Sequence, residues 1–349
     1  MNACIRAVVK AAPADCEVVG IRYGGLGLLR DRDVYEAAVA GDDPDYVDLT
    51  PARVRSILHQ GSTVLKTARM EAISAFLATK QLTDVPSAVG ALAPPAVERN
   101  GLGGLILIGG DTSSTAAYHL AHSAQLGIPI VVVPASIDND IKGTQQTLGF
   151  DSALQLAIAN IDCIRTTASS LDRIFVVEVM GRNHGQIALE AAFASGAEEV
   201  LIPEIEYTAD DLAVMRERLL RSSGSALVLV AEGAQLPASL RTASGPAADF
   251  ATFLTSSEST PNREVRLVEL GHVLRGAPPT ATTRALALRC GLRALDEVIG
   301  RARSGHHSPK LIGITTAGTL SLIDVAEDMT RRDTRATQAA YDEFRRLAY

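Results

Sequence analysis

Three carboxylates at the ends of two apolar runs are the residues of this sequence best suited to do chemistry. The run 102–110 ends in Gly-Gly and is followed by Asp111, and the run 127–133 is followed by Asp138 and Asp140. Apolar runs of this length predict buried parallel strands, and open α/β sheets place ligand sites at the carboxyl ends of such strands. Two carboxylates two residues apart repel each other, so we expect a divalent cation, or a proton taken from a substrate, beside them. The alternative is a hydrated surface turn that caps the next helix.

A glycine turn lies directly before a predicted helix at residues 113–125. Alanine and leucine recur on one face of this segment, which is typical of an amphipathic helix. Its first turn would present backbone N–H groups just after Gly109 and Gly110, and this geometry binds phosphate. The alternative is a glycine turn that only lets the chain reverse.

The order of the remaining elements predicts the fold that positions these residues. Strand, polar loop and helix alternate along 349 residues, which predicts an α/β protein with two doubly wound domains and mainly parallel sheets. Between the regular elements we expect a loop over 42–50, a helix from Pro51 to about His59, a connector over 87–95 and a partly ordered surface excursion over 235–262.

Composition narrows the class of ligand and the compartment. The net charge of −7, from 33 Lys and Arg against 40 Asp and Glu, argues against nucleic acid as the main ligand. The four cysteines form no C-x-x-C pair, which favours a reducing compartment. No apolar run approaches the roughly 20 residues needed to cross a bilayer, and Arg6 interrupts what would be the apolar part of a signal peptide. We therefore expect a cytoplasmic protein with no membrane partner.

Four sequence blocks stand out in chain order. They are Gly109-Gly110-Asp111, Ser136-Ile137-Asp138-Asn139-Asp140, Glu178-Val179-Met180-Gly181-Arg182, and Leu270-Gly271-His272 with Arg275. This ordered set resembles the phosphofructokinase family; the likeness extends from about residue 1 to about residue 322, and Gly-Phe-Asp at 149–151 adds to it. It implies phosphoryl transfer to the 1-hydroxyl of fructose 6-phosphate, giving fructose 1,6-bisphosphate in glycolysis.

The resemblance implies a role for each residue around the transferred phosphoryl group. Asp138 would be the base that accepts the proton of the sugar 1-hydroxyl. Asp111 and Asp140 would hold Mg²⁺, and Arg69 and Arg182 would neutralise charge on the phosphoryl group in flight. The donor would be bound by the glycine turn, the start of the next helix and one arginine, namely Gly109, Gly110, Asp111, Thr112, Ser113 and Arg69.

The resemblance also implies how the sugar phosphate is held. Arg173, Arg266 and Arg275, with His272, would grip the 6-phosphate, because a guanidinium presents a planar fork to phosphate oxygens. Two of these arginines would come from a neighbouring subunit, so a homo-oligomer, dimer or tetramer, with shared sites is expected. The other sugar contacts would come from Ser136, Asp140, Met180, Gly181, Arg182 and Glu232.

The domain division is also an expectation from the family. Residues 1–149 with about 274–322 would form the domain that binds the phosphate donor. Residues 150–273 with about 323–349 would form the domain that binds the sugar phosphate.

The sequence departs from the family pattern at the positions that distinguish the two phosphate donors. By the resemblance, members that use ATP have glycine at the positions of Thr112 and Ala135. Members that use pyrophosphate have aspartate at the first position and lysine at the second. Ala135 lacks the lysine charge and Thr112 lacks the carboxylate, so ATP is favoured and pyrophosphate is the alternative donor. Gly25 occupies the position where many ATP users carry an aromatic side chain that packs on adenine.

A second departure concerns the start of the chain. The family begins with a buried strand and a glycine-rich loop, whereas Met1 begins what resembles the helix after that loop. A start codon assigned too far downstream, or a naturally short protein, would each explain this. A catalytically impaired subunit that binds sugar phosphate is the corresponding alternative function.

Overall fold

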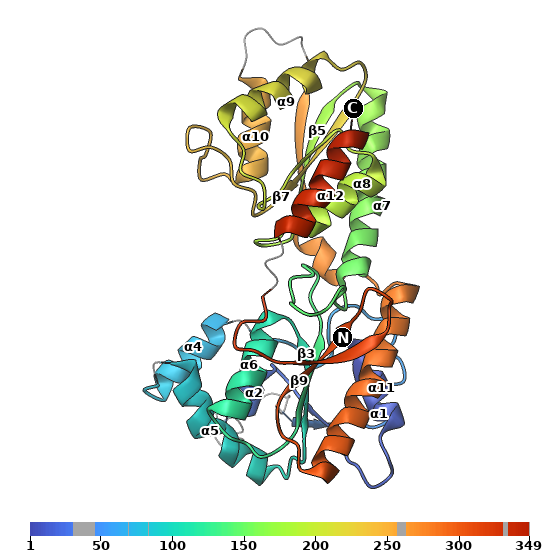
Figure 1. Cartoon of the computed structure of the whole chain (residues 1–349). Helices are drawn as coiled ribbons and strands as arrows, with labels where there is room; N and C mark the ends of the chain where they lie inside the picture. Colours follow the sequence, from blue (N-terminus) through green and yellow to red (C-terminus); the bar gives the residue numbers. More distant parts are fainter. Residues whose placement is uncertain (31–45, 69, 83, 257–262, 331–333, 349) are drawn as a thin grey trace, which may run out of the picture. The chain divides into compact units, whose positions relative to one another are not determined.

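The chain forms two compact units, each of which is described by itself. A computed structural model describes residues 1–30, 46–68, 70–82, 84–256, 263–330 and 334–348 (Figure 1). Unit 1 comprises Met1–Ser136, Asp140–Gly149 and Pro278–Arg331, and unit 2 comprises Ile137–Asn139, Phe150–Ala277 and Arg332–Tyr349. The expected division gave residues 137–139 and about 274–277 to the first domain, whereas they belong to unit 2, and it gave residues 323–330 to the second, whereas they belong to unit 1.

Unit 1 is built on a four-stranded sheet with the strand order β10-β9-β4-β3. β3 pairs in parallel with β4 and β4 with β9, whereas β10 is antiparallel to β9. A separate antiparallel pair joins β1 to β2. The strand bounds are β1 Val19–Ile21, β2 Tyr46–Asp48, β3 Leu105–Gly109, β4 Ile130–Pro134, β9 Lys310–Ile314 and β10 Leu320–Asp324.

Helices cover both faces of the unit 1 sheet, α1 and α11 on one and α5 and α6 on the other (Figure 1). Alternate residues of β4 point to the two sides, so Val131 packs with the first helix pair and Val132 with the second. A strand buried on both faces is therefore apolar throughout. The helix bounds are α1 Asn2–Ala11, α2 Gly25–Leu29, α4 Met70–Thr79, α5 Val85–Arg99, α6 Asp111–His122 and α11 Ala281–Ser304.

Unit 2 contains a fully parallel sheet with the order β6-β7-β5-β8. α7, α8 and α12 lie on one face, and α9 and α10 on the other (Figure 1). The strand bounds are β5 Ile174–Val179, β6 Glu199–Leu201, β7 Ala226–Ala231 and β8 Val265–Glu269. The helix bounds are α7 Phe150–Ser170, α8 Gln186–Ser195, α9 Ala209–Arg221, α10 Pro246–Thr255, the 3₁₀ helix η1 Gly271–Gly276, and α12 Thr334–Leu347.

A buried ionic cluster fixes the C-terminal helix to unit 2. Glu199 is fully buried and accepts hydrogen bonds from Arg218 of α9 (2.8 Å) and Arg345 of α12 (2.6 Å). Phe344 of α12 also meets Phe193 of α8 edge to face, with ring centroids 5.6 Å apart. The two arginines provide the compensating charge that a buried carboxylate requires.

Several local expectations were wrong. Residues 51–59 form turns, not a helix, although Val54 and Ile57 still pack against α1. The expected connector 87–95 is part of α5, which has two prolines in its interior but buries Val89, Ala93, Ala96 and Val97 in the core. Tertiary burial here outweighs the cost of proline in a helix.

The expected loop and the expected surface excursion each contain one regular element. β2 lies in the expected loop 42–50, and α10 lies in the expected excursion 235–262, of which 257–262 fall outside the described residues. The expected mainly parallel α/β fold is confirmed by the solved structures reported below, whereas the absence of the family's first strand and glycine-rich loop stays a prediction.

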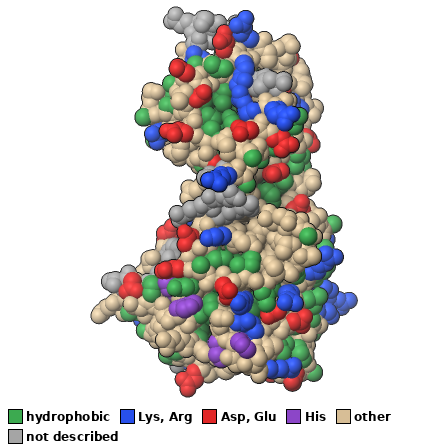
Figure 2. Space-filling model, in the orientation of Figure 1, with side chains coloured by type: hydrophobic (Ala, Val, Ile, Leu, Met, Phe, Trp, Pro, Cys, Tyr) green, Lys and Arg blue, Asp and Glu red, His purple; other side chains and the backbone are tan. Residues whose placement is uncertain are grey.

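The length of the helices and the distribution of surface charge bear on membrane and nucleic-acid partners. Within the described ranges, no helix combines the length and the apolar character that spanning a bilayer requires. Acidic and basic side chains are interspersed over the face drawn in Figure 2.

Candidate active site

The glycine turn of unit 1 lies at the carboxyl ends of two paired strands. Gly109 pairs with Pro134, and the Ala135 amide donates to the Gly109 carbonyl at 2.9 Å. A Cβ on Gly109 would lie 2.1 Å from the Ser113 Oγ, so only glycine lets the first turn of α6 fold back on the strand. Asp111 is therefore the first residue of α6, and Gly110 before it lies beside Ala135 and Ser136.

Two backbone amides at the start of α6, where the sequence predicts a phosphate-binding turn, already have acceptors within that turn. The amides of Ser113 and Ser114 both donate to the Gly110 carbonyl at 3.1 Å. The backbone N–H of Ser113 is therefore used inside the turn, and the expected contact of Ser113 with the phosphate donor stays a prediction. The exposed Thr112 side chain donates to Asp111 at 3.3 Å.

Asp140, which the resemblance assigns to Mg²⁺, is a buried carboxylate. Its Oδ1 has no hydrogen-bond partner among the residues that the structure describes. A buried carboxylate oxygen left in this way is costly unless a cation or water binds it. Within the described ranges no group of three or more His, Cys, Asp or Glu residues is placed to hold a metal ion, and the metal role of Asp140 stays a prediction.

The predicted base Asp138 belongs to unit 2 and is held by its neighbour. Asp138 and Asn139 are both buried. Asn139 has a φ of +53°, a left-handed conformation that asparagine tolerates better than most residues. Its side-chain amide donates to the Gln186 Oε1 at the start of α8 at 2.8 Å. This contact fixes the backbone directly after Asp138.

Glu232 fixes the loop that carries Arg182. Its Oε1 accepts the amides of Gly181 (3.2 Å) and Arg182 (2.7 Å), and Arg182 has a φ of +51°. A Cβ on Gly233 would lie 1.9 Å from the Arg182 carbonyl oxygen, so the end of β7 needs glycine here. Glu232 was expected to line the sugar, and the structure gives it the further task of ordering Met180–Arg182.

The four residues expected at the sugar phosphate fall into two groups within one chain. Arg173 precedes β5 and Arg266 lies near the start of β8, whereas His272 and Arg275 lie in η1, after the end of β8. A six-residue strand spans about 20 Å, and β5 pairs with β8 in parallel. The structure therefore places the two groups at opposite ends of the unit 2 sheet.

Arg173 and Arg266 share one counter-ion that the sequence analysis missed. Glu264 pairs with Arg173 through Oε2 and with Arg266 through Oε1. An acid two residues before an arginine at the start of a strand is a weak signal in sequence alone. Parallel pairing of β5 and β8 is what brings the three side chains together.

A carboxylate cluster at the other end of the same sheet was also missed. Glu178 of β5 lies opposite Glu269 of β8. Burial, and then the charges of Glu269 and Glu232, raise the pKa of Glu178, while the amide of Ala247 lowers it.

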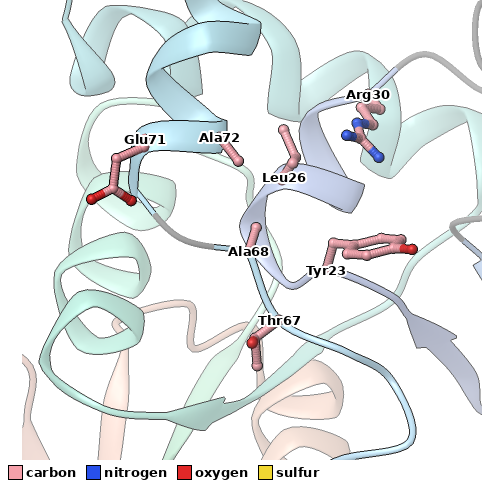
Figure 3. Close-up of a pocket in the computed structure, with 7 residues that line it drawn as sticks. All are labelled: Tyr23, Leu26, Arg30, Thr67, Ala68, Glu71 and Ala72. Carbon is pink, nitrogen blue, oxygen red and sulfur yellow. The ribbon is translucent and has the colours of Figure 1, made fainter.

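A pocket of about 670 Å³ lies in unit 1 between α2 and the start of α4 (Figure 3). The Tyr23 ring forms one wall, with the Arg30 guanidinium carbon 5.6 Å from its centroid. The Lys66 Nζ donates to the Tyr23 hydroxyl at 3.2 Å. The pocket is lined by Tyr23, Leu26, Arg30, Thr67, Ala68, Glu71 and Ala72.

This pocket flanks Arg69 in the sequence. Arg69 lies outside the described residues, but Ala68 before it and Glu71 after it both line the pocket. Tyr23 lies only two residues before Gly25, the position where many ATP users carry an aromatic side chain. This short spacing is the one signal in the sequence that points to Tyr23.

Comparisons with known proteins agree on one family. Residues 1–298 match the family described as phosphofructokinase. The chain is 40% identical over 299 residues to the ATP-dependent 6-phosphofructokinase of Bacillus cytotoxicus, covering 85% of this chain and 81% of that protein.

Solved structures have the same fold. Pichia pastoris phosphofructokinase in the T-state superposes with a TM-score of 0.76 and 27% identity over 99% of this chain, which spans 35% of the length of the Pichia chain. A pyrophosphate-dependent phosphofructokinase from Nitrosospira multiformis gives a TM-score of 0.74 at 18% identity, covering 98% of this chain and 88% of that one, and shows the fold alone.

Glu178→Gln should raise the melting temperature at pH 8. An acid whose pKa is raised in the folded state binds its proton more tightly there than in the unfolded state. It therefore makes folding less favourable as the pH rises above the ordinary glutamate pKa of 4.5. Glutamine removes that charge and can still accept the Ala247 amide. Thermal melts followed by circular dichroism should show the gain shrinking as pH falls toward 4.5. The exposed Glu206→Gln is the control, and a gain that does not depend on pH would contradict the explanation.

Proposed function

This chain belongs to the phosphofructokinase family, and we propose that it transfers the terminal phosphoryl group of Mg-ATP to the 1-hydroxyl of fructose 6-phosphate. The observation that carries the proposal is the 40% identity to an ATP-dependent 6-phosphofructokinase over most of both chains. The reaction is a phosphotransferase step of glycolysis and yields fructose 1,6-bisphosphate.

We assign the proton transfer to Asp138. Phosphoryl transfer requires in-line positioning and cations where negative charge accumulates, with one base to take the hydroxyl proton. The Asn139 contact to Gln186 holds the backbone beside Asp138, which supports a fixed position for this carboxylate. Arg182, on a loop ordered by Glu232, would neutralise the phosphoryl oxygens together with Arg69.

Asp111 and Asp140 would hold Mg²⁺. The unsatisfied Oδ1 of Asp140 supports this role, and a bound Mg²⁺ would supply positive charge to offset that of the donor phosphates. Gly109, Gly110, Thr112 and Ser113 would follow the donor phosphates at the start of α6.

The pocket at Tyr23 favours a nucleotide over pyrophosphate as donor. Pyrophosphate has no ring to fill a cavity with an aromatic wall, whereas a purine base stacks well on such a wall. Thr67 and Glu71 add hydrogen-bonding groups, and Arg30 adds a cation. Tyr23 would thus supply the aromatic surface that Gly25 lacks.

The sugar-phosphate site is proposed to be completed by a second copy of the chain. Arg173 and Arg266 lie at the opposite end of the unit 2 sheet from His272 and Arg275, so one chain does not bring all four to one phosphate. A symmetric homo-oligomer would place one group from each copy at each site.

Asp138→Asn should lower kcat by about 10²- to 10⁴-fold, because the amide cannot take the hydroxyl proton. Formation of fructose 1,6-bisphosphate would be measured with Mg-ATP, and Asp210→Asn, an exposed residue of α9, serves as the control. Turnover close to that of the unmodified protein would remove Asp138 from the role of base.

Tyr23→Ala should raise the KM for ATP about tenfold, with the KM for fructose 6-phosphate unchanged, because stacking on the base is lost. Tyr23→Phe keeps the ring and loses only the hydroxyl that accepts from Lys66, so it should behave nearly as the unmodified protein. Initial rates with ATP and with pyrophosphate test both points. An active protein that uses pyrophosphate alone would refute the nucleotide donor.

Subunit mixing tests the shared site. The double variants Arg173→Ala/Arg266→Ala and His272→Ala/Arg275→Ala should each bind fructose 6-phosphate poorly. After the two are unfolded and refolded together, mixed dimers would contain one intact site, and about a quarter of full activity should return. Recovery no greater than the sum of the separately refolded variants would show that the site is not shared.

A further inference from the structure

Glu264 joins two arginines that the proposed function places at the sugar phosphate. Each of its carboxylate oxygens serves one partner, Oε1 for Arg266 and Oε2 for Arg173. The side chains of Arg173, Glu264 and Arg266 are 23%, 42% and 56% exposed, so the cluster lies at the surface of unit 2 and is open to a ligand. Its net charge is +1.

The backbone around Glu264 is fixed by sheet pairing. The Glu264 carbonyl accepts the Ile174 amide at 3.0 Å, and the Arg173 carbonyl accepts the Ala226 amide at 3.1 Å. The two residues are therefore anchored on neighbouring strands, directly before β5 and β8. Because its backbone is held by the sheet, Glu264 keeps its carboxylate in a nearly constant place. This favours a constant geometry for the arginine side chains that the carboxylate binds.

The pairing leaves most of both guanidinium groups available. Arg173 uses its Nε for Glu264, and no residue in the described part of the chain accepts from its two Nη atoms. Arg266 uses one Nη, and its Nε and second Nη have no acceptor there either. The remaining edges present planar donor pairs, which is how arginine binds phosphate oxygens.

Two adjacent guanidinium groups would repel each other without an intervening anion. Glu264 offsets that repulsion, and it restricts long side chains that would otherwise lose several rotamers when a ligand binds. We propose that Glu264 is a positioning residue, which aligns Arg173 and Arg266 for the phosphate group of the sugar substrate. This inference rests on the proposed function.

A simple surface ion pair would behave differently. Such pairs contribute little, and their removal leaves ligand binding unchanged. Arg221 and Glu217 of α9 provide the comparison within the same unit, with side chains 77% and 66% exposed and an Nη1 to Oε1 distance of 3.0 Å. Glu217→Gln is therefore the matched control for Glu264→Gln.

The experiment measures steady-state kinetics and fructose 6-phosphate binding by calorimetry on the full chain. Glu264→Gln should raise the KM and Kd for fructose 6-phosphate about tenfold, the effect of losing one charged hydrogen-bond partner. The kcat and the KM for ATP should stay within about twofold. Glu264→Asp, which keeps the charge, should recover part of the affinity, and Glu217→Gln should change nothing.

A double-mutant cycle shows whether Glu264 acts through the arginines. In the Arg173→Ala/Arg266→Ala background, Glu264→Gln should have no further effect on the Kd for fructose 6-phosphate. An equal loss of affinity in that background would refute the positioning role. Tighter binding by Glu264→Gln would also overturn it, because Glu264 would then act only as a competing anion.

Failure of this inference can be told apart from failure of the proposed function. If the unmodified protein converts fructose 6-phosphate and Glu264→Gln behaves as Glu217→Gln does, only the role of Glu264 is refuted. If the unmodified protein neither binds nor phosphorylates fructose 6-phosphate, the proposed function fails and the inference fails with it.

Discussion

The parallel pairing of β5 with both β7 and β8 decides where every expected sugar-binding residue of unit 2 lies. Residues that follow these strands gather at one edge, and residues that precede them gather at the other. Glu232 can hold the Arg182 loop because β7 and β5 end side by side. For the same reason Glu264 can reach Arg173, although 91 residues separate them in the chain.

Two residues with a left-handed backbone lie in loops that are expected to carry catalytic side chains. Asn139 and Arg182 both have positive φ, and each has a side-chain contact that holds its segment, Asn139 through its own amide and Arg182 through Glu232. Such conformations are unfavourable alone and persist where the surroundings determine them. The cost is consistent with loops that must present Asp138 and the Arg182 guanidinium in fixed positions.

Sequence reasoning found the central strands and the blocks around them because long apolar runs and glycine turns are local signals. β4 is buried on both faces and was recognised from its apolar character. α5 was missed because Pro94 and Pro95 suggested a connector, while its stability comes from burial against distant residues. Contacts such as Glu264 with Arg173 depend on sheet register, which no local pattern encodes.

The same limit applies to the donor site. Family comparison drew attention to the empty position at Gly25, but only the folded chain shows that Tyr23, in a left-handed conformation, lines the pocket instead. In the proposed function, Tyr23 would supply the aromatic wall from a different point on the turn. Residue-by-residue transfer from relatives would miss a side chain placed in this way, because it compares only matching positions.

The clamp on Glu199 affects how the protein is made. Its partner Arg345 comes after residues 278–331 in the chain, and those residues belong to unit 1. During synthesis the N-terminal parts emerge first and fold as they appear. The carboxylate on β6 gains its second arginine only once α12 has left the ribosome, so unit 2 reaches its final form only after residues 278–331 of unit 1 have been translated.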